Sequence, residues 1–178
     1  MSIDTSRPFR PLRLALLTVS DTRTLAEDQS GDILEARIRQ AGHELVAREL
    51  LRDDVAAIEA KLRAWIAEPV IEVVIVTGGT GVTGRDVTPE AMKAVWEKEI
   101  PGFGELFRWI SFPKIGTSTI QSRACAGVAN GTYLFAVPGS RNAVKDAWDE
   151  ILVLQLDNRH RPCNLVELMP RLREHQTG

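Results

Sequence analysis

Apolar runs without alternation are the feature of this sequence that most constrains its fold. Arg13–Val19 reads RLALLTV and Glu72–Thr77 reads EVVIVT. Runs of this length and continuity are typical of strands that are buried on both faces of a sheet. A third strand is predicted over His43–Leu51 (HELVARELL). Strands buried on both faces need helices on each side, so these runs favour an α/β protein with a mostly parallel sheet.

The segments between these strands have the periodicity of helices. Ser30 is expected to cap a helix that stops near Gly42, a residue type common just after helix ends. A second helix is predicted from apolar residues that recur on one helical face: Val55, Ile58, Leu62, Trp65 and Ile66. Strand, helix, strand, helix and strand with short links predict right-handed βαβ units.

Helix signals also mark the second half of the chain. Thr88 is expected to be the N-cap of a helix, because Pro89 follows it and proline is favoured in the first turn. Residues 101–104 (PGFG) are expected to break the chain, and residues 105–112 (ELFRWISF) to form a short helix. A last helix is predicted over residues 140–156.

A turn signal indicates an antiparallel addition to the sheet. Asn130-Gly131 lies between VA and TYLFAV, and Asn-Gly in this setting predicts a hairpin with a type I′ turn. The predicted fold class is therefore α/β, a three-layer, mostly parallel sheet with helices on both faces and an added antiparallel hairpin. Residues 1–11 are polar and contain proline, so we expect a flexible arm there and a single domain over residues 12–178.

Charge and chain length argue against several classes of protein. The formal net charge of −2 over 178 residues gives no overall attraction to nucleic acid or to anionic membranes. The apolar runs are too short to span a bilayer, and the start lacks the apolar core of a signal peptide. Cys125 and Cys163 lie far apart without a CxxC spacing and are expected to be small core residues. We therefore expect a cytoplasmic protein without nucleic-acid or membrane partners.

Polar clusters follow each of the three predicted parallel strands. They are Ser20 and Asp21, the pair 53–54 (Asp-Asp), and residues 77–79 (Thr-Gly-Gly). Since ligands of such sheets bind at the carboxyl ends of the strands, these clusters are expected to meet at one edge. A fourth loop, Pro138-Gly139-Ser140, follows the predicted strand at residues 133–137 and is expected at the same edge.

The loop of residues 77–86 matches two phosphate-binding templates in part. Residues 79–84 (GTGVTG) fit the dinucleotide pattern G-x-G-x-x-G, and Arg85-Asp86 stand where a P-loop has Lys and Ser or Thr. Both templates are rejected, because the predicted helix starts only near Pro89 and not within the glycine motif. What is left is exposed backbone N–H groups, a guanidinium and a carboxylate, which suit an anion together with a metal ion.

Several motifs in order resemble the MoaB/MogA family of molybdenum-cofactor biosynthesis proteins, and the MoaB branch in particular. IGTSTIQSRA, AGVANGT and RPCN carry the resemblance to that branch. The family-level motifs are LTVSD at 17–21, TGGTGVTGRDVTPEA at 77–91, PGFGE at 101–105, TSTIQSR at 117–123 and PGS at 138–140.

The resemblance implies that the domain binds molybdopterin and transfers AMP from MgATP to its terminal phosphate. The alternative of a non-catalytic molybdopterin-binding or carrier protein stays open. Asp53 and Asp86 match the family's two aspartates most tied to activity and are expected to be catalytic and to hold Mg²⁺. The residues expected to contact ATP and molybdopterin are Ser20, Asp21, Thr77, Gly78, Gly79, Thr80, Gly81, Arg85, Ser122, Arg123, Pro138, Gly139 and Ser140.

The resemblance also implies a homo-oligomer, a trimer or a hexamer, and a molybdate-insertion enzyme as a possible partner. The candidate interface is the stretch PGFGELFRWISF, in which Phe103, Phe107, Trp109 and Phe112 are close together. A core helix would have the same composition, so both interpretations stay open. Trp65, Trp96, Trp109 and Trp148 are expected in the core or at an interface rather than stacked on a pterin.

Overall fold

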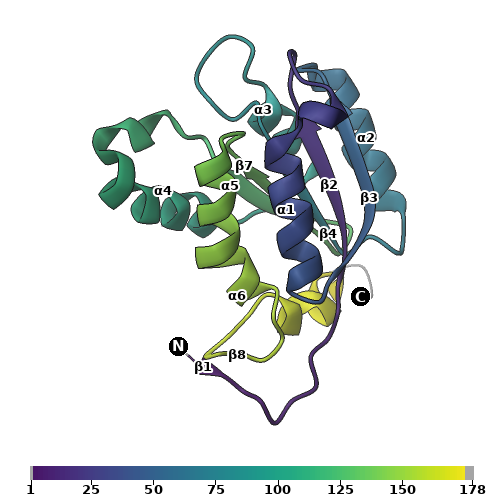
Figure 1. The fold of residues 1–178 in the computed structure, drawn as a ribbon. Helices are drawn as coiled ribbons and strands as arrows, with labels where there is room; N and C mark the ends of the chain where they lie inside the picture. Colours follow the sequence, from purple (N-terminus) through teal and green to yellow (C-terminus); the bar gives the residue numbers. More distant parts are fainter. Residues whose placement is uncertain (1, 175–178) are drawn as a thin grey trace.

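A six-stranded sheet forms the centre of the computed structural model, which describes residues 2–174 (Figure 1). Residue 1 of the predicted arm and residues 175–178 of the predicted domain lie outside the described residues. The strand order is β3-β2-β4-β7-β6-β5. The strands are β2 (Arg13–Val19), β3 (Glu44–Leu51), β4 (Val73–Thr77), β5 (Lys98–Glu99), β6 (Cys125–Ala129) and β7 (Thr132–Val137).

The predicted fold class is confirmed by the strand directions. β3, β2, β4 and β7 run parallel to one another, while β6 pairs antiparallel with β7 and β5 antiparallel with β6. Asn130 (φ 47°) and Gly131 (φ 80°) join β6 to β7, and positive φ at both residues is what a type I′ turn requires. Thr18 pairs with Thr77, and Thr77 with Val137, so the parallel strands end at one level.

Helices cover both faces of the sheet and bury two separate cores. Alternate residues of β2 divide between them: Leu14 and Leu16 pack in one core, Ala15 and Leu17 in the other. This alternation explains why the strand sequences are apolar throughout. The first core is covered by α1 (Gln29–Gln40), α4 (Pro101–Ile115) and α5 (Arg141–Ala147), the second by α2 (Val55–Ala67) and α3 (Thr88–Val95).

Two predicted helix caps are wrong, for the same physical reason. Asp28 caps α1 through a hydrogen bond from Gly31 N, and Ser30 lies inside the helix with its hydroxyl donating to the carbonyl of Gly139 (2.7 Å). Thr88 is the first residue of α3 and its hydroxyl donates to the carbonyl of Gly78 (2.8 Å). A hydroxyl can accept from an amide of its own helix or donate to a carbonyl of another segment. Here both hydroxyls donate to loop carbonyls at the carboxyl edge of the sheet, so neither caps its helix.

The PGFG stretch does not break the chain as predicted but begins α4. Pro101 is the first residue of the helix, where its missing N–H costs no intrahelical hydrogen bond. The helix predicted over residues 140–156 is present as α5, a π-helical turn at Trp148–Leu152 and α6 (Val153–Gln155).

The N-terminal segment contacts β8 and the residue that precedes β4. β1 (Ser2–Ile3) pairs antiparallel with β8 (His160–Arg161), and Arg10 forms an ion pair with Glu72. The mobility of this segment stays a prediction. Within residues 2–174, no helix has both the length and the apolar composition needed to cross a bilayer.

The two cysteines differ in their surroundings. Cys125 is half-buried, and burial raises the pKa of its thiol to about 12. Cys163 is exposed, so the prediction of a core role is wrong for this residue. It lies between β8 and the 3-10 helix η4 (Val166–Arg171), outside the six-stranded sheet.

Candidate functional site

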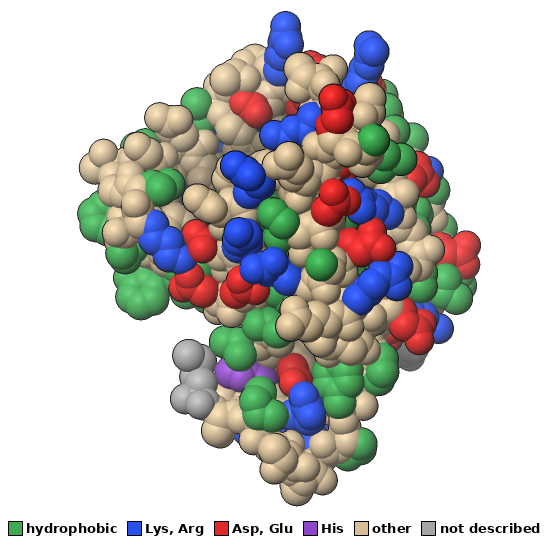
Figure 2. Space-filling model, viewed as in Figure 1, with side chains coloured by type: hydrophobic (Ala, Val, Ile, Leu, Met, Phe, Trp, Pro, Cys, Tyr) green, Lys and Arg blue, Asp and Glu red, His purple; other side chains and the backbone are tan. Residues whose placement is uncertain are grey.

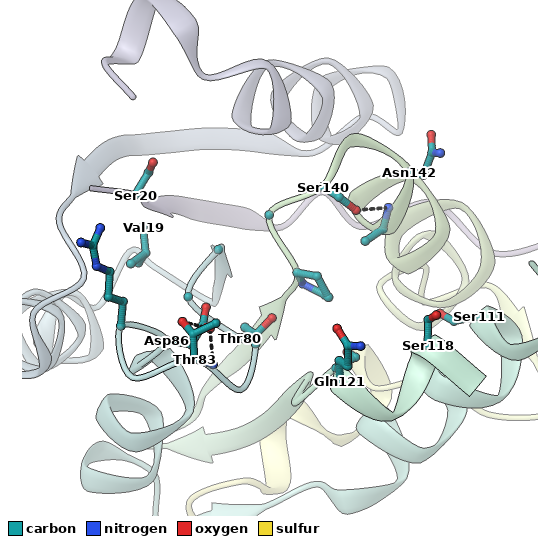
Figure 3. A pocket seen from close by; sticks show the side chains of 18 of the residues that line it. Val19, Ser20, Thr80, Thr83, Asp86, Ser111, Ser118, Gln121, Ser140 and Asn142 are labelled. Atoms are coloured by element: carbon teal, nitrogen blue, oxygen red, sulfur yellow. Dashed lines mark hydrogen bonds between the residues drawn. The ribbon is translucent and has the colours of Figure 1, made fainter. Parts of the chain in front are cut away.

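A cavity of about 630 Å³ opens at the carboxyl edge of the parallel strands. One wall is formed by the loops that follow β2, β3, β4 and β7, and the other by α4, the 3-10 helix η2 (Gly116–Gln121) and α5. Figure 3 shows Thr80, Thr83 and Asp86 on the first side and Ser111, Ser118 and Gln121 across from them. The expected meeting of the strand-end loops is therefore present.

Most of the residues predicted for the site line this cavity. Thr77 and Arg123 do not. Those that do are Ser20, Asp21, Asp53, Gly78, Gly79, Thr80, Gly81, Arg85, Asp86, Ser122, Pro138, Gly139 and Ser140.

Thr77 and Ser140 have structural hydrogen bonds of their own. The buried hydroxyl of Thr77 donates to the carbonyl of Pro138 (3.2 Å) and so connects β4 to the loop after β7. The hydroxyl of Ser140 caps α5 by accepting from Ala143 N (3.2 Å), although the residue also borders the cavity. Thr77 therefore supports the loop after β7 without lining the cavity itself.

Asp53 is free to face the cavity because its neighbour caps the helix. Asp54 accepts from Ala57 N (2.7 Å) at the start of α2. Gly79, at φ 63°, approaches Asp53 so closely that a Cβ on it would lie 2.7 Å from Asp53 Oδ1. Burial, together with the negative charges of Asp21 and Asp86, raises the pKa of Asp53 above its ordinary value. A cation beside this carboxylate would relieve that repulsion.

Asp86 is held by its own loop. Its Oδ2 accepts from the backbone N–H (2.8 Å) and from the hydroxyl (2.7 Å) of Thr83, as Figure 3 shows. Burial by itself would raise the pKa of Asp86, but the hydrogen bonds from Thr83 and Gly81 and the charge of Arg123 outweigh it and lower that pKa. The Asp86 carboxylate is therefore ionised across the neutral range, with its orientation fixed by Thr83.

Asp21 and Arg85 complete this side of the site. Asp21 Oδ1 accepts from Asp53 N (3.2 Å), and Arg85 Nη1 lies 3.8 Å from Asp21 Oδ2. The Arg85 side chain is 80% exposed at the mouth of the cavity. A guanidinium so placed can bind an incoming phosphate without losing a buried partner.

Two carboxylates at this edge have the donor chemistry that suits Mg²⁺. Nowhere in residues 2–174 do three or more His, Cys, Asp or Glu side chains form a group able to hold a metal ion. Mg²⁺ does not require such a cage, since it is usually bound by one or two carboxylates plus phosphate oxygens and water. Asp53 and Asp86 fit this second mode.

The wall opposite the carboxylates was mostly missed by sequence reasoning. Lys114 of α4 forms an ion pair with Asp146 of α5 (2.8 Å) and also contacts Glu150. Three η2 residues of this wall, Ser118, Thr119 and Gln121, belong to the TSTIQSR motif, from which only Ser122 and Arg123 were selected. The missed residues with polar side chains are Thr22, Arg23, Thr83, Ser111, Lys114, Ser118, Thr119, Gln121, Asn142 and Asp146.

Comparison with known proteins gives matches over most of the chain. Residues 15–158 match the family model described as a probable molybdopterin binding domain. The chain is 49% identical over 159 residues to molybdenum cofactor biosynthesis protein B of Escherichia coli (strain K12), covering 89% of this chain and 94% of that protein. It is 39% identical over 159 residues to the protein of the same name from Bacillus subtilis (strain 168), covering 88% and 94%.

Solved structures of similar proteins have the same fold. A crystal structure of a molybdenum cofactor biosynthesis protein B superimposes with a TM-score of 0.84 at 36% identity, over 94% of this chain and 99% of that one. The tungsten cofactor synthesizing protein MoaB from Pyrococcus furiosus gives a TM-score of 0.76 at 30% identity, over 92% and 98%.

Proposed function

Because this chain belongs to the family of probable molybdopterin binding domains, we propose that it acts in molybdenum-cofactor biosynthesis, binds molybdopterin and transfers AMP from MgATP to the terminal phosphate. The observation that carries the proposal is the pair of carboxylates, Asp53 and Asp86, at one end of a cavity bordered by a glycine-rich loop. The cavity volume of about 630 Å³ lies within the range of small-molecule sites.

The proposed reaction is a nucleotidyl transfer. A phosphate oxygen of molybdopterin attacks the α-phosphorus of ATP, the bond from that phosphorus to the bridging oxygen breaks, and pyrophosphate leaves with the electron pair. No covalent enzyme intermediate is needed, so positioning and neutralisation of charge account for the catalysis. On the protein side, the guanidinium of Arg85 supplies positive charge at the mouth of the cavity.

The carboxylates have a separate role. Asp53 and Asp86 would hold Mg²⁺, which supplies positive charge to the phosphates of ATP during the transfer. The elevated pKa of Asp53 supports this role, because a carboxylate crowded by like charges gains most from a bound cation. The lowered pKa of Asp86 keeps a second ligand ionised.

The opposite wall supplies groups suited to a polar heterocycle. Ser118, Gln121 and Asn142 border the cavity, and hydroxyl and amide groups both donate and accept hydrogen bonds. We assign the pterin to this wall and the nucleotide to the glycine-rich loop. Ser20 and the Pro138–Ser140 loop belong to the first wall, and Ser122 follows η2 on the opposite wall.

The alternative is a protein of the same pathway that binds or carries molybdopterin without catalysis. One observation favours it: Oδ2 of Asp86 is engaged by Thr83, as expected for a carboxylate whose task is to organise a loop. Metal binding would then fall mainly to Asp53 and would be weaker.

We further propose that the protein is a homo-oligomer, a trimer or a hexamer, with a second copy covering α4. Phe103 and Phe107 of the candidate interface are in the core, whereas the Trp109 side chain is 73% exposed. Hydrophobic side chains gather where Figure 1 draws α4, at the left edge of Figure 2. The exposed apolar residues of α4 and η2 are Leu106, Trp109, Phe112, Ile115 and Ile120. We also propose that a molybdate-insertion enzyme receives the product. The proposed location is the cytoplasm.

To test the proposal, the protein is incubated with molybdopterin, ATP and Mg²⁺. Adenylylated molybdopterin is then measured by chromatography, and released pyrophosphate by a separate assay. Asp86→Ala serves as the control. Product from the unaltered protein and none from Asp86→Ala supports the transferase. Bound molybdopterin without product supports the carrier alternative, and neither binding nor product rejects both.

A further inference from the structure

All three side-chain nitrogens of the half-exposed Arg123 contact one loop and the helix after it. Its Nε donates to the carbonyl of Gly81 (2.6 Å) and its Nη2 to the carbonyl of Asp86 (2.7 Å). The Glu90 carboxylate of α3 accepts from Nη1 and from Nη2 (3.2 Å). The backbone N–H of Arg123 donates to the carbonyl of Thr80 (2.9 Å).

The guanidinium lies behind the loop and not in the main cavity. It borders a second cavity of about 430 Å³, together with Lys93 and Arg108. Each of its three nitrogens already donates to a carbonyl or a carboxylate. A guanidinium with these partners is poorly placed to anchor a phosphate or a pterin in the main cavity, which was its expected role.

We propose that Arg123 is a positioning residue of the transfer: it holds the loop of residues 81–86 at both ends, so that the Asp86 carboxylate faces the substrates. This inference rests on the proposed function. Residue 122, its neighbour, borders the main cavity. Arg123 therefore connects the η2 wall to the glycine-rich loop and sets the distance between the two substrates.

The chemistry of the contacts requires arginine. A guanidinium presents donors in a rigid planar fork, which can reach two carbonyls and one carboxylate at once, whereas a lysine ammonium is a single point on a flexible chain. Arg123→Lys therefore keeps the charge and loses the geometry. Arg108 gives a matched control, because it borders the same second cavity but its guanidinium makes long hydrogen bonds, 3.5 Å and 3.4 Å, to the carbonyls of Ser122 and Ala124.

Amide hydrogen exchange of the full chain tests the loop contacts without reference to activity. In peptides covering residues 78–88, we expect Arg123→Lys to raise the exchange rate by about 10-fold or more, as local opening becomes easier. Arg108→Lys should leave these rates unchanged. Equal exchange in the unaltered protein and Arg123→Lys, with both folded by circular dichroism, would overturn the proposal.

Steady-state kinetics separates positioning from ligand contact. We expect Arg123→Lys to lower kcat by about 10-fold to 100-fold, the range for residues that orient metal ligands, with the KM for molybdopterin within twofold. A raised KM with unchanged kcat would instead make Arg123 a direct substrate contact and overturn the proposal. If the unaltered protein forms no product, the proposed function fails and the positioning role with it, while the exchange rates still decide whether Arg123 holds the loop.

Discussion

A Cβ atom on Gly78 would lie 2.1 Å from the carbonyl oxygen of Val19. The backbone of the glycine-rich loop therefore crosses directly over the end of the neighbouring strand, and Gly78 does so at φ 101°. Both facts require a residue without a side chain. The N–H of Gly78 also donates to the carbonyl of Val137 (3.0 Å), so this position joins three strand ends beneath the cavity.

The first prediction is that Gly78→Ala destabilises the protein strongly. The clash and the unfavourable φ should lower the free energy of unfolding by at least about 2 kcal/mol, which corresponds to a Tm lower by about 4–8 °C for a chain of this size. Differential scanning calorimetry measures it.

Gly84→Ala is the matched control in the same loop. A Cβ there meets no atom of the described residues within 4 Å, and its φ is not in the left-handed region. Gly84→Ala should leave the free energy of unfolding unchanged or raise it by up to about 1 kcal/mol, because alanine restricts the unfolded chain more than glycine does. Equal losses in both variants would mean that the loop is not packed as described.

The second prediction concerns Asp53→Asn. The charge of Asp53 is disfavoured in the folded protein by burial and by Asp21 and Asp86, so its removal should raise the Tm of the metal-free protein near neutral pH. The same variant should lose the Mg²⁺-dependent rise in Tm, and turnover should fall by about 100-fold or more, as for loss of a charge-stabilising group. Thermal melts with and without Mg²⁺ measure both effects. A lower Tm without metal would contradict the assigned repulsion.

The third prediction follows from the raised pKa of Asp53 and concerns pH. A carboxyl group whose pKa is higher in the folded than in the unfolded protein stabilises the folded state at low pH. This contribution is lost as the pH rises through the pKa of the folded state. The advantage of Asp53→Asn over the unaltered protein should therefore shrink as the pH falls from neutral through the raised pKa.

Mg²⁺ affinity should also fall as the pH falls, since a proton on Asp53 competes with the metal. Titration calorimetry with MgATP at several pH values would measure weaker binding at lower pH. In Asp53→Asn this dependence should be smaller, and a dependence that is unchanged would assign the titrating group elsewhere.

Strands and their carboxyl ends could be predicted because their signals are local. The apolar run Arg13–Val19 coincides with β2, and parallel strands must place the residues that follow them, such as Asp53, at one edge. The hairpin at Asn130-Gly131 was predictable for the same reason, since the turn type is a property of the two residues themselves.

The η2 wall and the helix caps depend on tertiary contacts. Ser118 and Gln121 lie in a short 3-10 helix with no apolar period, so only their place in the TSTIQSR motif indicated that they belong to the site. Ser30 and Thr88 each had a plausible local partner, but the carbonyls that they bind belong to other loops, 109 and 10 residues away in the sequence. Arg123 was expected at the site through the TSTIQSR motif, but only the fold places its guanidinium behind the loop.

The fourth prediction concerns the exposed apolar residues of α4. Trp109→Asp should reduce the mass in solution to that of a single chain, because a charge at the centre of an apolar contact is costly to bury. Light scattering coupled to size exclusion measures the mass. Val70→Asp, at a residue that is 43% exposed in the turn between α2 and β4, should leave the mass unchanged. A single-chain mass for the unaltered protein would reject self-association.

The fifth prediction distinguishes a metal ligand from a loop-organising carboxylate at Asp86. Thr83→Val keeps the backbone hydrogen bond to Asp86 Oδ2 and removes the hydroxyl bond of 2.7 Å. If Asp86 holds Mg²⁺, losing the group that orients it should weaken Mg²⁺-dependent turnover by about 10-fold, and higher Mg²⁺ should restore part of the rate. If Asp86 only organises the loop, the loss should be the same at every Mg²⁺ concentration. The Mg²⁺ concentration for half-maximal rate is therefore the deciding measurement. The comparison is Ser20→Ala, which removes a hydroxyl from the loop after β2 on the same cavity.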